Sequence, residues 1–179
     1  AGLVAEGHFE DAIARLQQAI AILDGAGEDA QPDAANLLTG LARLHLQVGE
    51  LAEATTAASR ARTIIEPLIP RIPGEAGHLI HIEALALLGT IAREEARYAD
   101  AEALLKRALT ITETSLGPTH ERVEAALNDL GVLYKYWGKF DAAEQLYRRA
   151  LSLVEARVGA DHIDTATLHH NLGGLAHAR

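Results

Sequence analysis

The sequence predicts an all-α fold, a solenoid of antiparallel helix pairs with about eight helices. Apolar residues recur at spacings of three and four along most of the 179 residues, which is the periodicity of a helix face. Hydrophobic residues make up 49% of the chain but aromatic residues only 4%, so alanine and leucine, which favour helices, supply much of the apolar content. The chain also repeats itself at a period of 42 residues, which is typical of stacked helical hairpins.

The repeat is clearest in the second half of the chain. Residues 96–104 align with residues 138–146 at an offset of 42. Between Leu51 and Tyr98 the corresponding spacing is 47, so this unit carries five extra residues. They fall in the proline-rich segment 67–74, which cannot be regular helix throughout because proline lacks the backbone N–H. We therefore expect one non-helical insertion in an otherwise regular array.

We expect one continuous solenoid over residues 1–179, with both ends lying inside repeats of a longer protein. Thr119 and Asp161 are expected to cap helix starts, and Gly117 and Gly159 to end the preceding helices. The expected helices are residues 8–24, 33–48, 50–66, 77–95, 97–115, 120–137, 139–157 and 162–178. The expected repeats are a partial repeat 1–32, repeat 33–76 with its insertion near 67–74, repeats 77–118 and 119–160, and a half repeat 161–179.

Composition and motifs exclude most catalytic chemistry. The chain has no cysteine, which excludes disulfides, thiolate zinc sites and cysteine nucleophiles. Gly25-Ala26-Gly27 lacks the Lys-Ser/Thr of a phosphate-binding loop, and no Gly-x-Ser-x-Gly motif occurs. We therefore expect no enzyme, no catalytic residue and no cofactor.

The histidines do not form a metal motif. His78 and His81 share a helix face, and His169, His170 and His177 follow on the last expected helix. A structural zinc site needs three or four converging ligands, and no spacing here matches one. We expect no physiological metal, and only weak adventitious binding at the first pair.

Charge and hydropathy limit the partners. The net charge of −9 argues against general nucleic-acid binding, which needs a basic face, and is compatible with a basic protein partner. No stretch of about 18 apolar residues exists to span a bilayer, and the first residues do not resemble a signal peptide. We expect a cytoplasmic protein with no membrane contact.

The segment Leu127–Ala150 reads Leu-x-x-Leu-Gly-x-x-Tyr-x-x-x-Gly-x-Phe-x-x-Ala-x-x-x-Tyr-x-x-Ala. This pattern closely resembles the tetratricopeptide repeat signature, and the long period is similar to the kinesin light chain type of repeat. Residues 142–151, followed by Gly-Ala-Asp-His at 159–162, are similar to the hallmark of that subfamily. The resemblance implies a right-handed α-α superhelix, and the abundance of alanine and arginine over lysine favours a bacterial source.

The resemblance also implies a binding face. In tetratricopeptide stacks the first helix of each pair lines a concave groove, where partner peptides lie. Three cations are expected to lie along this groove, one in each repeat: Arg43, Arg93 and Lys135. Each is expected to pair with a carboxylate or carbonyl of a bound peptide. The side-chain amide of Asn128 is expected to hold the peptide backbone. Helical spacing gives the full set of groove residues: Asn36, Thr39, Arg43, Gln47, Glu83, Thr90, Arg93, Asn128, Val132, Lys135, Tyr136, Thr167, His170 and His177.

We therefore expect a scaffold that binds a protein or peptide partner. The alternative is a structural or self-association element of a larger regulatory protein. Leu168, Leu172 and Leu175 on the last helix are expected to leave an apolar patch, because the next helix of the array is missing. Such a patch would favour self-association through the terminal helices.

Overall fold

The computed structural model describes the backbone of residues 2–178 and the side chains of residues 8–175 and 177. Ala1 and Arg179, the chain ends that we placed within repeats, lie outside the described residues. The described part contains no strand. Its helices are α1 (Gly2–Asp24), α2 (Gln31–Val48), α3 (Leu51–Ile65), α4 (Ala76–Glu94), α5 (Tyr98–Ser115), α6 (Glu121–Tyr136), α7 (Phe140–Val158) and α8 (Ile163–Ala178), with two short 3-10 helices, η1 (Glu28–Ala30) and η2 (Glu66–Arg71).

The prediction of an all-α fold built from about eight helices is confirmed. Seven helices begin and end within two residues of the expected positions. The first helix was predicted too short, since it begins at Gly2 and not at residue 8. Gly7 lies within this helix, since a helix tolerates one glycine at a cost of about 1 kcal/mol.

The proline-rich insertion is not regular α-helix, as predicted. After α3 the chain continues as the 3-10 helix η2, which contains Pro67 and Pro70. Ile72 is then extended, and Gly74 adopts a φ of 72° before α4 begins. The extra residues of this repeat are thus accommodated between two helices, without interrupting either of them.

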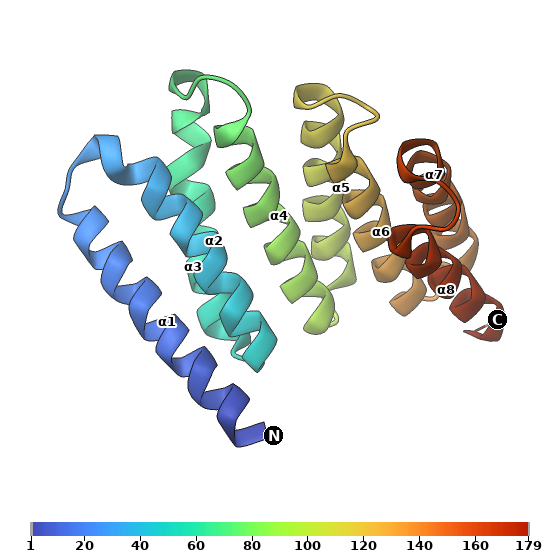
Figure 1. Ribbon diagram of the computed structural model, residues 1–179, viewed down its shortest axis with the longest axis horizontal. Coiled ribbons are helices and arrows are strands. Elements are labelled where there is room, and N and C mark those ends of the chain that lie inside the picture. Colours follow the sequence, from blue (N-terminus) through green and yellow to red (C-terminus); the bar gives the residue numbers. More distant parts are fainter. Residues whose placement is uncertain (1, 179) are drawn as a thin grey trace. The chain divides into compact units, whose positions relative to one another are not determined.

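The chain divides into two compact units, residues 1–91 and residues 92–179. In the first unit α2 packs against both α1 and α3, and its core includes Leu38, Ile65 and Leu85. In the second unit α6 packs against α5 and α7, and α8 packs against α7. Consecutive helices within each unit run antiparallel (Figure 1). This arrangement gives each helix pair a shared apolar face that is buried by its neighbours.

Helices α6 and α7 cross at a glycine. A Cβ on Gly131 would lie 2.5 Å from Cε1 of Tyr147, far inside van der Waals contact. Tyr147 is fully buried, and its hydroxyl forms no hydrogen bond with any described residue. Burial raises the pKa of Tyr147 to about 12, because the phenolate is poorly solvated in the core. The tyrosine ring therefore fills the space that the missing side chain of Gly131 leaves open.

Two histidines cap helices in the second unit. His120 is the N-cap of α6, and its Nδ1 accepts a hydrogen bond from the backbone N–H of Arg122 at 3.1 Å. His162 immediately precedes α8, and its Nδ1 accepts from the N–H of Asp164 at 3.2 Å. The prediction that Thr119 and Asp161 cap these helices is wrong, because each helix begins one residue later than expected. The histidine nitrogens take the role that we gave to shorter oxygen side chains.

A charged cluster joins α5 to the turn after α6. Glu102 accepts a hydrogen bond from the Tyr134 hydroxyl at 2.5 Å and pairs with Lys106 at 2.8 Å. The Lys139 ammonium lies 3.2 Å from the ring centroid of Trp137 and 3.7 Å from Glu102. The hydrogen bond from Lys106, followed by that from Tyr134, lowers the pKa of Glu102. The Glu102 carboxylate therefore connects two repeats, and its ion pairs require that it is ionised.

We expect this link to weaken in acid. Because folding lowers the pKa of Glu102, its stabilisation is complete above the ordinary glutamate value of 4.5 and is lost as the pH falls below that value. The thermal midpoint, followed by Trp137 fluorescence between about pH 6 and about pH 3, should fall less steeply for Glu102→Gln than for the wild type. Glu155→Gln, at an exposed glutamate of α7 with no ion pair to any described residue, should keep the wild-type slope. Equal slopes for Glu102→Gln and the wild type would contradict the assignment.

Candidate binding face

Helices α6 and α8 form one continuous face in the second unit, here named the α6–α8 face. On α6 the residues Glu121, Ala125, Asn128, Val132 and Lys135 recur at spacings of three and four, so they share one side of the helix. Asp164, Thr167, Asn171 and Gly174 do the same on α8. Arg157 bridges Glu124 and Asp164 at one end, Asn128 contacts Asn171 in the middle, and Lys135 lies near Gly174 at the other end. The two helices therefore run in the same direction.

The middle of the face carries an asparagine pair. Asn171 donates a hydrogen bond from Nδ2 to Oδ1 of Asn128 at 2.7 Å, and both side chains are half-buried. Asn128 was predicted to line the binding face, but Asn171 was missed. The repeat offset of 42 aligns Asn128 with His170, so attention fell on the neighbouring position. The helical spacing of four from Thr167 was the signal that could have found Asn171.

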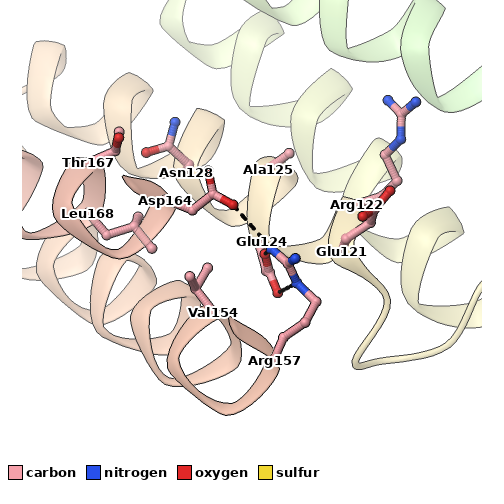
Figure 2. Close-up of a pocket in the computed structure, with 10 residues that line it drawn as sticks. All are labelled: Glu121, Arg122, Glu124, Ala125, Asn128, Val154, Arg157, Asp164, Thr167 and Leu168. Carbon is pink, nitrogen blue, oxygen red and sulfur yellow. Dashed lines mark hydrogen bonds and ion pairs between the residues drawn. The ribbon is translucent and has the colours of Figure 1, made fainter. Parts of the chain in front are cut away.

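A pocket of about 360 Å³ opens beside the asparagine pair, at the N-terminal ends of α6 and α8 (Figure 2). Val154 and Leu168 are buried and give it an apolar floor, and Ala125 adds an apolar wall. The residues that line it are Glu121, Arg122, Glu124, Ala125, Asn128, Val154, Arg157, Asp164, Thr167 and Leu168.

An ion pair closes one side of this pocket. Arg157 donates from Nε to Oε1 of Glu124 at 2.9 Å and from Nη2 to Oε2 at 2.6 Å, a bidentate geometry. The Glu124 side chain is only 9% exposed, so this carboxylate depends on the guanidinium for its solvation. Arg157 Nη2 also lies 3.4 Å from Oδ2 of Asp164, which ties α8 to the same cluster (Figure 2). The hydrogen bond to Glu124 raises the pKa of Arg157, so the guanidinium group stays charged.

Two predicted cations, Arg93 of α4 and Lys135 of α6, lie near the C-terminal end of α6 in different settings. The Arg93 guanidinium stacks 5.0 Å from the ring centroid of Tyr136 and pairs with Glu94 at 2.8 Å. Lys135 extends toward α8, where its Nζ would lie 3.0 Å from a Cβ on Gly174. It forms no ion pair with any described residue. Lys135 is therefore the cation of this end that is available to a partner.

In the first unit, two of the predicted groove residues, Arg43 and Thr39, have partners within the chain. Arg43 forms an ion pair with Glu83, so both side chains already have a partner within the chain. Thr39 is buried, with 4% exposed, and its hydroxyl donates to the carbonyl of Asn36 at 2.7 Å. The rest of the predicted set lies at the surface to different degrees: Asn36, Gln47, Thr167, His170 and His177 are exposed, and Thr90 and Val132 are half-buried.

Residues 81–156 match the model of the tetratricopeptide repeat family, and this stretch runs from α4 into α7. Residues 81–156 therefore carry tetratricopeptide repeats. Its structure is similar to that of BtubC (BKLC) from P. vanneervenii, with a TM-score of 0.78 and 20% identity over 95% of this chain and 66% of that one. It is also similar to a Podosopora anserina kinesin light chain of nearly identical TPR-like repeats, with a TM-score of 0.74 and 19% identity over 97% of this chain and 80% of that one.

The expected likeness to kinesin light chain repeats is thus confirmed for the fold, which is what solved structures at these identities show. This chain spans 66% of the length of BtubC. No curated protein sequence matches it.

The prediction of an apolar patch on α8 is wrong for two of its three leucines. Leu168 is 4% exposed and Leu175 is 2% exposed, whereas Leu172 is half-buried. The reason is that α8 turns these leucines toward the preceding helices, where α7 packs against it. The surface left for self-association is correspondingly smaller.

Within the part of the chain that the structure describes, no group of three or more histidine, aspartate or glutamate side chains is placed to hold a metal ion. His81 is buried, and His78 beside it is half-buried. No described helix is both long enough and apolar enough to cross a membrane.

Proposed function

We propose that this tetratricopeptide chain is a protein-binding module that holds an extended segment of a partner protein against its α6–α8 face. Tetratricopeptide repeats generally mediate protein–protein interactions, and helical repeat arrays present their inner helices as binding surfaces. The observation that carries the proposal is the asparagine pair beside an apolar pocket. Recognition of an extended peptide requires groups that form hydrogen bonds with its backbone and a pocket that holds one of its side chains.

The asparagine pair can read a peptide backbone. The bond between Asn171 and Asn128 uses one acceptor and one donor of the two amides. The Nδ2 group of Asn128 and the Oδ1 atom of Asn171 remain, which are a donor and an acceptor held side by side. A peptide unit presents the complementary carbonyl and N–H. Because the two amides hold each other in place, they offer these groups with little loss of side-chain entropy.

The pocket can hold one apolar side chain of the same segment. Its floor of Val154 and Leu168 is already buried, so a leucine- or phenylalanine-sized group would be removed from water there. Burial of such a side chain contributes about 1.5–3 kcal/mol, which exceeds what an exposed polar contact adds. We therefore expect the pocket to provide most of the affinity and the asparagine pair to fix the position of the backbone.

Filling the pocket from the protein side is expected to abolish binding. Peptides selected from a phage-displayed library of random nine-residue sequences against the wild-type chain supply the probes, and fluorescence anisotropy measures their affinity. Ala125 is exposed on α6 at the pocket wall, so Ala125→Trp should weaken binding by at least about tenfold while the fold survives.

The matched control is Ala156→Trp, an equally exposed alanine on α7 that does not line the pocket. It should bind the selected peptides with wild-type affinity. Circular dichroism of both variants confirms that each is folded. If the selected peptides bind Ala125→Trp as tightly as the wild type, or if the library yields no enriched peptide, the proposed function is wrong.

A further inference from the structure

We propose that the α6–α8 face selects a segment with a fixed charge order: a basic residue next to an apolar one, with an acidic residue about four to six positions away. This inference rests on the proposed function and adds the chemical identity of the partner. It follows from three features of the face, namely the carboxylates at the pocket, the occupied helix starts and the unpaired Lys135.

The pocket end of the face carries an excess of negative charge. Glu121, Glu124 and Asp164 line the pocket, against the two guanidinium groups of Arg122 and Arg157. Arg157 is shared between Glu124 and Asp164, and its contact with Asp164 is the longer one at 3.4 Å. Glu121 is exposed and forms no ion pair with any described residue. A lysine or arginine next to the side chain in the pocket would meet these carboxylates at the rim.

The N-terminal ends of α6 and α8, which lie at the pocket, do not offset this preference for a basic residue of the partner. The N-terminus of a helix attracts anions because its first N–H groups have no partner within the helix. Here His120 accepts from the N–H of Arg122, and His162 accepts from the N–H of Asp164. Acidic residues also fill the first turns of both helices. The pocket end is therefore a carboxylate surface and not an open anion site.

The other end of the face has the opposite charge. Arg43 and Arg93 are neutralised by Glu83 and Glu94, so the ladder of cations expected from the sequence is reduced to Lys135. Lys135 is half-buried, and its ammonium lies close to Gly174 of α8, 3.0 Å from the position of a Cβ on that glycine. A carboxylate of the partner can pair with Lys135 there without displacing an ion pair of the chain.

The distance between the two ends sets the spacing in the partner. Glu121 and Lys135 are fourteen residues apart on α6, which is about 21 Å at a rise of about 1.5 Å per residue. Ala125, at the pocket wall, is about 15 Å from Lys135 on the same scale. An extended peptide covers about 3.3 Å per residue. The acidic residue is therefore expected about four or five positions from the apolar residue and about six from the basic one.

Sequencing the peptide pools selected from the same nine-residue library tests the charge order. Peptides enriched on the wild-type chain should carry lysine or arginine beside leucine or phenylalanine, with aspartate or glutamate at the expected spacing. A pool selected on Lys135→Glu should keep the basic–apolar pair but exchange the acidic residue for a basic one. Peptides selected on the wild type should bind Lys135→Glu about tenfold more weakly, and the loss should shrink as salt is raised.

The control is Arg15→Glu, which makes the same charge change at an exposed arginine of α1 that forms no ion pair with any described residue. It should select the wild-type pool. Pools that bind at the pocket, as judged by Ala125→Trp, but show no charge order would overturn this inference and leave the proposed function standing. A dimer in light scattering that Ala125→Trp abolishes would assign the face to a second copy of the chain and overturn it as well.

Discussion

Replacing Tyr147 by alanine should lower the free energy of unfolding by about 3–5 kcal/mol, as is usual when a large aromatic side chain is removed from a core. Tyr147 is fully buried, and its ring fills the space beside Gly131 of α6. Urea denaturation followed by circular dichroism measures the change. A loss below about 1 kcal/mol would show that the ring is not the centre of this packing.

Tyr147→Phe is the matched control, since it keeps the ring and removes only the hydroxyl. That hydroxyl forms no hydrogen bond with any described residue, so its removal should leave stability unchanged or raise it slightly. The two proteins should differ in alkali. Folding raises the pKa of Tyr147 from 10.0 to about 12, so wild-type stability is complete below pH 10 and is lost as the pH rises toward 12. Tyr147→Phe should lose less stability over that range, and an equal loss would contradict the prediction.

Sequence periodicity was sufficient for the helices because each repeat restates the same pattern. Positions such as Leu127, Leu130 and Tyr134 recur at helical spacing, and all three are buried. The helix caps were harder to predict. His120 and His162 cap two helix starts, although a histidine nitrogen that accepts from a first-turn N–H is less usual than a serine or aspartate oxygen. A shift of one residue at the helix start was enough to select the wrong cap.

Which residues share the face of the candidate site could be predicted from the sequence, but which of them form ion pairs or hydrogen bonds within the chain could not. Helical spacing places Asn128, Lys135 and Thr167 on one face, but it cannot say which cations find partners in a neighbouring helix. Arg43 is neutralised by Glu83, forty positions away, and such a pair depends on packing between repeats. Asn171 was missed because the repeat offset differs by one residue from the contact between α6 and α8. Periodicity thus predicts which residues share a face, whereas contacts between helices determine which of them are free to bind.

Two glycines at the same position of successive repeats should respond differently to the same substitution. Gly131 and Gly173 are 42 residues apart, so each follows the second leucine of the repeat pattern. A Cβ on Gly131 would lie 2.5 Å from Tyr147, whereas a Cβ on Gly173 would have no atom within 4 Å. Gly131→Ala should therefore destabilise the chain by about 1–3 kcal/mol through overpacking. Gly173→Ala should be neutral or stabilising by up to about 1 kcal/mol, because alanine restricts the unfolded chain.

A double-mutant cycle separates the steric cause from a general intolerance of α6 to substitution. If the clash with the ring is what destabilises Gly131→Ala, then the cost should shrink by about 1 kcal/mol or more in a Tyr147→Leu background, where the aromatic carbons are absent. Both single variants and the double variant are compared by urea denaturation. An unchanged cost in that background would mean that Gly131 is required by α6 itself. A reduced cost would place the requirement in the crossing of α6 and α7, since a glycine is needed there only because a tyrosine faces it.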